Sequence, residues 1–285
     1  MVQQRTRDEG WKHAKLSGHK NEDLVKIAIE EDSDFAAKLL LSLNASDKTI
    51  KKVSIGGLHE KNVENIIPGG RKTKSKTDLK IEYTDDTYNN ISIKKSTSGQ
   101  VYYVRSGIFF DCFETHFKVE IPSDVKKAIT LFWSSPTNPE SKKIIEIYAD
   151  KGKKKEYELQ VKHNSVNAET LKKYNESLYN SMLQWFKDNA YELAFLSFAS
   201  GAAKNDSDWS DHVWYINLLK ENNVNEVFSI KDICDASKKY AESRTYYGSD
   251  NGGTTIQLPF GFIEWHHNQL QFHHKYSCVK ALFSQ

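Results

Sequence analysis

Two short segments of alternating polar and apolar residues constrain the fold of this chain most strongly. TDLKIEY (77–83) and NISIKKS (90–96) both alternate, and the residues between them, TDDTYN, are typical of a turn. A period of two residues is the pattern of a half-buried strand, because successive side chains point to opposite faces of a sheet. The sequence therefore predicts a β-hairpin over residues 77–96.

The second predicted strand carries a lysine near its centre. Residues two apart share a face of a strand, so Ser92, Lys94 and Ser96 lie on one face, while the isoleucines of the segment lie on the other. A lysine in this position needs an acidic partner, and Asp78, at the start of the neighbouring strand, is the available one. A structural hairpin with an ion pair on its surface is the alternative to a functional site.

A carboxylate beside a lysine on adjacent strands is a known arrangement for the hydrolysis of phosphodiesters. The carboxylate binds Mg²⁺ through hard oxygen ligands. The metal polarises the phosphate and lowers the pKa of a bound water. The lysine positions that water or stabilises charge on the phosphate in the transition state.

This layout resembles the PD-(D/E)XK nuclease family, in which an Asp ends one strand and a (D/E)-x-K tripeptide lies on the next. One group of type II restriction endonucleases of this family shows a specific order of motifs. A Gly-Gly turn is followed by a strand that begins with Lys-Thr-Asp, and the next strand carries Asn-x-Lys followed by serines. This chain carries PGGRKTKSKTDLKI and then SIKKSTS. Here Ser92 stands where the family has the second acid, and a serine supplies a hydrogen bond without a charge.

The resemblance implies an α/β fold with a central mixed β-sheet flanked by helices, together with a β-rich C-terminal recognition region. It also implies an Mg²⁺-dependent type II restriction endonuclease that cuts duplex DNA at a short sequence and leaves a 5′-phosphate. Asp78, Ser92 and Lys94 would be its catalytic residues, and Asp78 would bind the metal. The alternatives are a repair or structure-selective nuclease of the same family, and a DNA-binding protein without catalysis.

A second acid for the metal is expected from the first predicted helix, as in the family. Apolar residues at three- and four-residue spacing predict that helix over 22–43, with Asn21 as its N-cap. Glu22 would then lie in the first turn and serve as a catalytic and metal-binding residue, with Glu30 and Glu31 as alternatives. Compensation of the helix dipole is the other explanation of Glu22.

The remaining pattern predicts a mixed sheet and further helices. Strands are expected over 48–55, 142–150, 155–162 and 190–200, and helices over 121–135 and 168–188. A helix that leads into a buried strand is half of a crossover connection, which favours some parallel pairing.

Basic residues cluster just before Asp78. The run RKTKSK (71–76) contains no acid, and Arg71, Lys72, Lys74 and Lys76 are predicted to contact DNA phosphates, with Ser96 beside them. KGKKK (151–155) is a similar run. A solvated loop is the alternative in each case.

Residues 248–276 combine a glycine-rich polar segment with alternating strands. Asn, Gln and His side chains can pair with base edges, so Asn251, Gln269, Gln271 and His273 are predicted to read the DNA sequence. A metal site formed by the histidines and a plain hairpin edge are the alternatives. The polar loop 200–212, with Trp209, is the next candidate for recognition.

Composition narrows the class of protein. The 285 residues include 40 basic and 38 acidic side chains and three cysteines, and no apolar run approaches the ~18 residues of a membrane span. We expect a cytoplasmic protein with a single domain over 1–285, a catalytic core to about residue 200 and a recognition region from about 201. A palindromic DNA target favours a homodimer. A cognate methyltransferase is the expected genetic partner.

Overall fold

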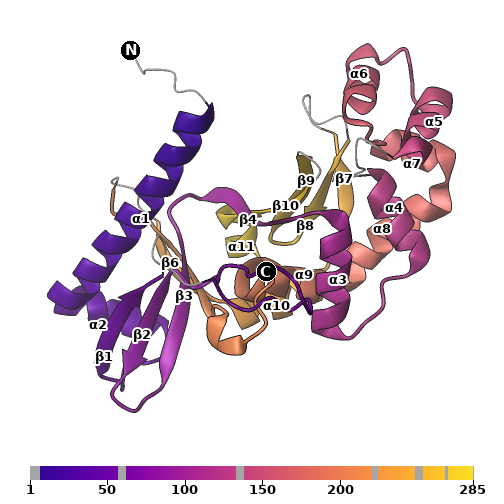
Figure 1. Ribbon diagram of the computed structural model, residues 1–285. Coiled ribbons are helices and arrows are strands. Elements are labelled where there is room, and N and C mark those ends of the chain that lie inside the picture. The colour runs from indigo at the N-terminus through magenta and orange to yellow at the C-terminus, as the bar shows by residue number, and fades with distance from the viewer. Residues whose placement is uncertain are drawn as a thin grey trace, which may run out of the picture. The chain divides into compact units, whose positions relative to one another are not determined.

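The computed structural model describes residues 7–56, 62–132, 138–219, 224–247, 253–266 and 269–284. The chain forms two compact units (Figure 1), each built from two separate stretches. The first unit comprises Met1–Thr97 and Phe198–Asp232, and the second comprises Ser98–Ser197 and Ile233–Gln285. None of the helices in the described ranges has the length and apolar character of a membrane span. The assignment of catalysis to residues before about 200 and of recognition to residues after it stays a prediction.

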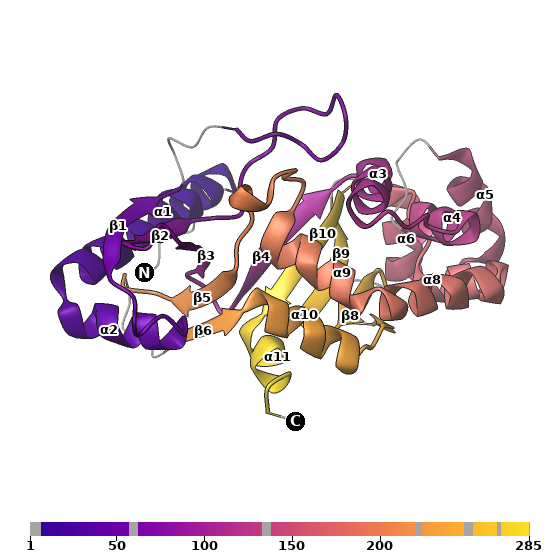
Figure 2. The same ribbon diagram turned by 90° about the horizontal axis from the view of Figure 1, so that it is seen from below.

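The first unit contains a mixed five-stranded sheet. Its order is β1 (Ile50–Ile55), β2 (Leu79–Tyr83), β3 (Tyr88–Lys94), β5 (His212–Ile216) and β6 (Asn225–Ser229). Only β3 and β5 are parallel among these neighbours, and Figure 2 shows β5 between β3 and β6. The predicted hairpin, the strand near 48–55 and the mixed character of the sheet are confirmed.

Two helices, α1 (Arg7–Glu31) and α2 (Ser33–Ser42), cover one face of this sheet. Their apolar side chains form one core with alternate residues of the strands. The buried members of this core include Val25, Ile29, Leu39, Leu43, Leu79, Ile81, Ile91, Ile93 and Trp214. The period-two pattern of the strands thus sends one set of side chains to the helices and leaves the other set for the opposite face.

The register of the strands defines what lies on that opposite face. Leu79 pairs with Ile91 on the core side. Ser92 and Lys94 lie one and three residues after Ile91 on β3. Their side chains therefore point to the opposite face of the sheet, away from α1 and α2. In the parallel pair, Lys94 is aligned with Tyr215 of β5. The face opposite the helices therefore carries the predicted catalytic residues of β3.

The prediction of a single helix over 22–43 with Asn21 as N-cap is wrong. The helical chain breaks at Asp32, whose carboxylate accepts hydrogen bonds from the backbone N–H groups of Asp34 and Phe35 and caps α2. Asn21 lies inside α1 and is fully buried. Its amide donates to the Ile216 carbonyl at 3.0 Å and accepts from the Leu218 N–H at 2.7 Å. These two hydrogen bonds connect α1 to the end of β5.

The second unit contains an antiparallel five-stranded sheet. Its order is β4 (Ser98–Val104), β10 (Gln269–Lys275), β9 (Gly261–His266), β8 (Thr255–Leu258) and β7 (Arg244–Tyr246). Aromatic side chains fill the core beneath it: the ring of Phe109 lies 5.7 Å from that of Phe272 and 6.2 Å from that of Trp185. The prediction of a β-rich C-terminal region is confirmed, and β4 joins it from the middle of the chain.

Helices make up the rest of the second unit. They are α3 (Ser106–Phe117), α4 (Ser123–Phe132), α5 (Pro139–Tyr148), α6 (Lys154–His163), α7 (Ala168–Tyr174), α8 (Glu176–Asp188), α9 (Ala190–Phe195) and α11 (Tyr276–Ala281). A π-helix (Leu196–Ser200) and α10 (Ile230–Lys239) each contain residues of both units. A short 3₁₀ helix, Asp206–Asp208, lies in the first unit. The helix predicted near 121–135 is confirmed as α4.

Four other predictions about this region are wrong. Residues 142–150 and 155–162 are helical (α5 and α6) and not strands: Asn138 caps α5, and Pro139 is suited to its first turn. The single helix predicted over 168–188 is two helices, because Asn175 ends α7 and caps α8. Residues 190–200 are α9 and the π-helix. They are apolar on most sides because they are buried, so periodicity does not separate helix from strand there.

The buried amide of Asn21 gives a test of this packing. Asn21→Ala removes one partner from each of two backbone groups and is expected to lower the free energy of unfolding by about 2 kcal/mol. Lys20→Ala, an exposed neighbour, is the control and is expected to change it by less than about 0.5 kcal/mol. Urea denaturation followed by circular dichroism measures both. Equal stability of the two variants would show that the amide does not secure α1 to β5.

Candidate active site

Asp78 immediately precedes β2 and continues the sheet with its backbone. Its N–H donates to the Ile91 carbonyl of β3 at 2.9 Å, and its carbonyl accepts from the Gly56 N–H, next to β1, also at 2.9 Å. The main chain of Asp78 is thus held from both sides. The side-chain carboxylate of Asp78 extends toward β3.

The carboxylate of Asp78 binds two groups of β3. Its Oδ2 atom accepts from the Ile93 backbone N–H at 2.7 Å and from the Ser92 hydroxyl at 3.1 Å. The Lys94 ammonium donates to Ser92 Oγ at 2.6 Å and lies 3.9 Å from Oδ2. The structure therefore brings together Asp78, Ser92 and Lys94 in one hydrogen-bonded group.

The exposure of these side chains suits contact with a ligand. Ser92 is buried, whereas the side chains of Lys94 and Asp78 are 19% and 31% exposed. The buried hydroxyl joins two charged groups that solvent and ligands can reach. The Oδ1 atom of Asp78 accepts no hydrogen bond from the residues that the structure describes.

The segment before Asp78 is anchored to the distant loop 200–212. The Ser75 hydroxyl donates to the Asp208 carbonyl at 2.7 Å, and the Thr77 hydroxyl donates to that of Trp209 at 3.3 Å. The Asn90 amide of β3 also donates to the Trp209 carbonyl, at 2.8 Å. The indole N–H of Trp209 donates to the Ala203 carbonyl at 2.9 Å. Trp209 is therefore part of the support beneath the site.

Lys76 lies between these two anchors and is half-buried. Burial, and then the positive charge of Lys94, lower the pKa of Lys76 to about 7, while the charge of Asp78 acts in the opposite direction. Both groups of the site thus influence this amine. The sequence analysis placed Lys76 among the phosphate contacts of the basic run and did not detect its closeness to Asp78 and Lys94.

Glu22 does not lie in the first turn of a helix, as predicted, but well inside α1. Its side chain is 12% exposed, and its Oε2 atom lies 3.1 Å from Nδ1 of His19. Nearby on the helix, the Ser17 hydroxyl accepts a hydrogen bond from Lys95, just after β3. Glu30, one of the two alternatives, pairs with Lys26 at 2.7 Å. The role of Glu22 as a metal ligand stays a prediction.

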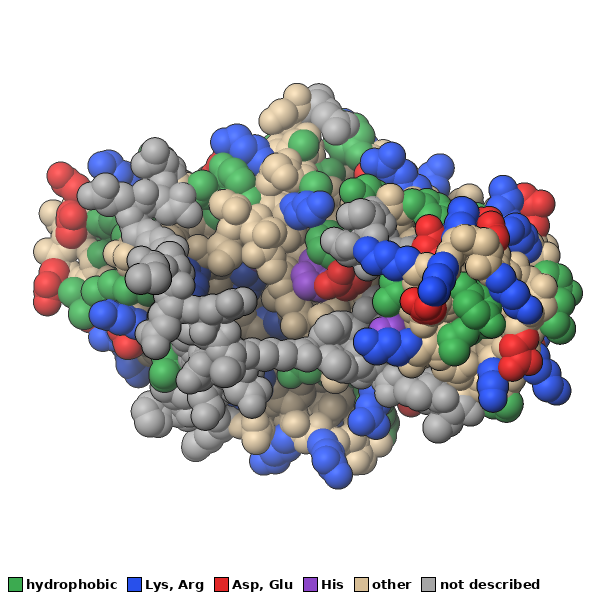
Figure 3. Space-filling view, turned by 90° about the horizontal axis from the view of Figure 1, so that it is seen from above, with side chains coloured by type: hydrophobic (Ala, Val, Ile, Leu, Met, Phe, Trp, Pro, Cys, Tyr) green, Lys and Arg blue, Asp and Glu red, His purple; other side chains and the backbone are tan. Residues whose placement is uncertain are grey.

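The predicted phosphate contacts lie on a folded loop. Arg71, Lys72 and Lys74 are exposed, and the loop is closed by an isolated bridge between Val63 and Thr73. The Asn65 amide donates to the Arg71 carbonyl at 2.8 Å. Ser96 is also exposed and lies beyond the end of β3, in a bend, so it does not extend the strand face as predicted. On the face that Figure 3 shows, described Lys and Arg side chains are interspersed with Asp and Glu.

The predicted base-reading residues belong to the second unit. Gln269, Gln271 and His273 alternate along β10 and are half-buried, while the residues between them face the core. The His273 ring stacks on that of Phe262 with centroids 4.7 Å apart, and its Nε2 atom lies 3.1 Å from Glu264 Oε1. Asn251 lies outside the described residues. Within the described ranges, no three or more His, Cys, Asp or Glu side chains are grouped so as to hold a metal.

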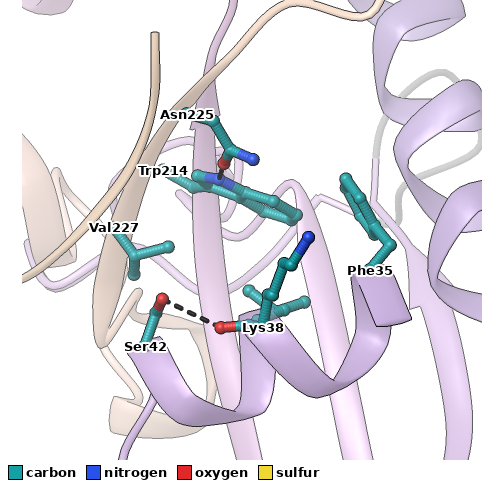
Figure 4. Close-up of a pocket in the computed structure, with 7 residues that line it drawn as sticks. Phe35, Lys38, Ser42, Trp214, Asn225 and Val227 are labelled. Atoms are coloured by element: carbon teal, nitrogen blue, oxygen red, sulfur yellow. Dashed lines mark hydrogen bonds between the residues drawn. The ribbon is translucent and has the colours of Figure 1, made fainter. Parts of the chain in front are cut away.

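A separate pocket lies on the helix-covered face of the first sheet (Figure 4). It has a volume of about 200 Å³ and is lined mainly by residues of α2, β5 and β6, among them Phe35, Lys38 and Trp214. The Trp214 indole N–H donates to Asn225 Oδ1 at 2.8 Å. Ser92 and Lys94 lie on the other face of the sheet, so this pocket is not part of the candidate active site.

Comparison with known proteins finds similarity in structure and none in sequence. No protein-family model and no curated protein matches the sequence. Among solved structures, the chain is similar to restriction endonuclease MspI in complex with its cognate DNA, at 12% identity and a TM-score of 0.44, over 95% of this chain and 94% of that chain. A similarity of this size does not transfer residues or activity, so the function is argued from the site itself.

Proposed function

We propose that this chain is an Mg²⁺-dependent endonuclease of the PD-(D/E)XK type that cuts duplex DNA at a short specific sequence, as a type II restriction endonuclease does. One observation carries the proposal: Asp78 at the start of β2 and the Ser92-x-Lys94 tripeptide of β3 form one hydrogen-bonded group. This is the juxtaposition on which metal-assisted phosphodiester hydrolysis depends. The proposed partners are double-stranded DNA, a second copy of the chain and a cognate methyltransferase as genetic partner.

The residues present fit a magnesium ion. Mg²⁺ is usually held by one or two carboxylates and takes its other ligands from water and substrate phosphates. Asp78 offers a partly exposed carboxylate whose Oδ1 atom accepts no hydrogen bond from the described residues. Asp78 would hold the ion, with Glu22 proposed as the second acid. The ion would supply polarisation of the phosphate and a water of lowered pKa.

Lys94 and Ser92 have separate roles in this mechanism. The Lys94 ammonium would stabilise the negative charge that develops on the phosphate in the transition state. The Ser92 hydroxyl accepts from Lys94 and donates to Asp78, so it holds both groups in position without adding a charge. In the proposed reaction Ser92 is therefore a positioning residue.

DNA binding is assigned to two surfaces. The exposed Arg71, Lys72 and Lys74 would bind phosphates regardless of sequence. The side chains of Gln269, Gln271 and His273 on β10, and of Asn251, would read base edges. These roles follow from residue chemistry and, for Arg71, Lys72 and Lys74, from exposure.

A DNA-binding protein without catalysis is the second candidate function. Ser92 replaces a charged metal ligand of the family, and this observation favours reduced or lost metal binding. Incubation of the protein with plasmid DNA and Mg²⁺ separates the candidates. Discrete fragments support the restriction enzyme, and smearing or nicking supports a repair or structure-selective nuclease. Retention of intact DNA supports the non-catalytic binder.

Lys94→Ala is expected to lower the cleavage rate at saturating DNA by roughly 100- to 1,000-fold and to spare affinity. The reason is that Lys94 is assigned to the transition state, so its loss should affect rate more than binding. Single-turnover cleavage and DNA binding in Ca²⁺ measure the two effects. Cleavage at the wild-type rate would remove the nuclease assignment from this site.

Asp78→Asn is expected to abolish cleavage in Mg²⁺ because the amide keeps the shape of the side chain and loses the charge that holds the ion. In the wild type, Ca²⁺ is expected to support binding without cleavage. Titration of Mg²⁺ against cleavage rate for both proteins makes the measurement. Normal cutting by the variant would place the metal elsewhere.

Lys74→Ala is expected to weaken specific and non-specific DNA alike. One lost phosphate contact lowers the slope of log affinity against log salt by about 1. Binding of cognate and unrelated duplexes between low and physiological salt gives this slope. A change in sequence preference would show instead that the basic loop reads bases.

Gln271→Ala is expected to reduce discrimination at one base pair by about 1–3 kcal/mol while leaving metal dependence intact. Ser277→Ala, an exposed hydroxyl on α11, is the matched control. Cleavage of the cognate site and of single-base variants measures the effect. If alanine at Asn251, Gln269, Gln271 and His273 in turn changed neither rate nor preference, recognition would lie elsewhere in the chain.

A further inference from the structure

Strand β4 forms one edge of the second sheet and pairs with β10 (Figure 2). Tyr103 is paired with Gln271 and Gln100 with His273, which leaves Val101 as the extra residue of a β-bulge. Gln100 and Tyr103 are three residues apart, so they would face opposite sides of a regular strand. The bulge brings both side chains to the same side, and a bulge often serves to redirect a side chain in this way.

The side of β4 that carries Gln100 and Tyr103 faces away from the aromatic core. Tyr102 lies on the core side, where it is buried and its ring lies 5.6 Å from that of Phe272. Tyr103 is 59% exposed, and Gln100 is exposed as well. Arg105 follows β4 with a backbone that is still extended (φ −70°, ψ 147°). Alternation therefore places its exposed side chain on the side of Tyr103.

These outward side chains have no partner within the part of the chain that the structure describes. No side-chain hydrogen bond, ion pair or ring contact joins Gln100, Tyr103 or Arg105 to another described residue. The same holds for the amides of Gln269 and Gln271 on β10. An amide carries two donors and an acceptor, and a guanidinium carries five donors. This side of the strand pair therefore offers directional hydrogen-bonding groups to a molecule outside the chain.

The dimensions and the charge of the strand pair fit the major groove of duplex DNA. That groove is about 12 Å wide and admits a two-stranded β-ribbon. All five strands of the sheet, at a spacing of about 4.8 Å, would span about 19 Å and exceed it. Residues 98–105 and 269–275 contain Arg105 and Lys275 and no Asp or Glu. A cationic ribbon with available amides complements the phosphates and the base edges of a duplex.

We propose that β4 and β10 form a recognition ribbon in the major groove, in which Arg105 reads a guanine and Gln100 reads an adenine. The inference rests on the proposed function and deepens it, because it names the second strand of the recognition surface. A guanidinium can donate two hydrogen bonds to O6 and N7 of guanine, and an amide can bond N6 and N7 of adenine. Gln100 follows Lys94 by six residues, so one short stretch of chain carries the catalytic lysine and the first of these contacts.

Arg105→Ala and Gln100→Ala test the ribbon, with Arg244→Ala as the matched control. Arg244 is exposed on β7, at the opposite edge of the same sheet, and its side chain has no partner among the described residues. Sequencing the ends of plasmid fragments identifies the site that the wild type cuts. Arg105→Ala is expected to reduce discrimination at one G·C pair by roughly 10- to 100-fold, and Gln100→Ala at one A·T pair. Arg244→Ala is expected to keep the preference at every position.

Modified bases test the same contacts on the unaltered protein. 7-Deazaguanine and 7-deazaadenine lack the N7 acceptor, so each removes one hydrogen bond from a bidentate contact. At the G·C pair assigned to Arg105, 7-deazaguanine is expected to weaken binding by the wild type and not by Arg105→Ala. At the A·T pair assigned to Gln100, 7-deazaadenine is expected to act in the same way on the wild type and Gln100→Ala. Binding in Ca²⁺ measures both pairs, and thermal unfolding confirms that the variants fold.

The outcomes separate this inference from the proposed function. A wild type that neither cuts nor binds any duplex overturns both. A wild type that binds one sequence without cutting overturns the proposed function alone, and the binding comparisons then decide on the ribbon. A wild type that cuts at a defined site, with Arg105→Ala and Gln100→Ala keeping its full preference, overturns the ribbon alone.

Two further results would also overturn the ribbon. An equal loss of affinity for all duplexes in Arg105→Ala would assign Arg105 to phosphates and not to a base. A change of base preference in Arg244→Ala would show that the whole sheet face, and not the strand pair β4 and β10, contacts the bases.

Discussion

The hydrogen bond from the Ile93 N–H to Oδ2 of Asp78 connects the first sheet to the candidate active site. Asp78 precedes β2, and its side chain serves as an acceptor for β3 beside the last backbone bonds between the two strands. A buried N–H without a partner costs about 1–3 kcal/mol, so this bond contributes to the stability of the strand pair. The same bond orients the carboxylate toward Ser92 and Lys94. Folding of the strand pair therefore assembles the site.

Ser92 connects the two charged side chains of the candidate active site. Ser92 Oγ accepts a hydrogen bond from Lys94 and donates one to Asp78, and these two bonds hold the three side chains together. A second carboxylate at this position would bring another negative charge next to Asp78. With serine, the hydroxyl links Asp78 and Lys94 without adding a charge of its own.

The loop 200–212 supports the site from a distant part of the sequence. Its backbone carbonyls bind Ser75, Thr77 and Asn90, and Asp211 accepts from the Asn90 N–H at 2.8 Å. Burial raises the pKa of Asp211, and the bond from the Asn90 N–H acts against that rise. Trp209, considered from the sequence as a recognition residue, secures this loop through Ala203. The loop fixes the strand that carries Lys94 and the segment that carries Lys76.

The sequence by itself determined the hairpin and its two faces, because alternation is a local property that any half-buried strand must show. It also named Asp78 as the acidic partner of Lys94, because Asp78 starts the neighbouring strand. Tertiary structure alone decided the rest. The helix α1 begins at Arg7, so Glu22 lies well inside it, and Asp32 caps a separate helix α2. Buried helices such as α9 lose the polar face that would reveal their period. The contact of Lys76 with Gly201 has no local signal, because it exists only after the chain has brought the loop 200–212 against the start of β2.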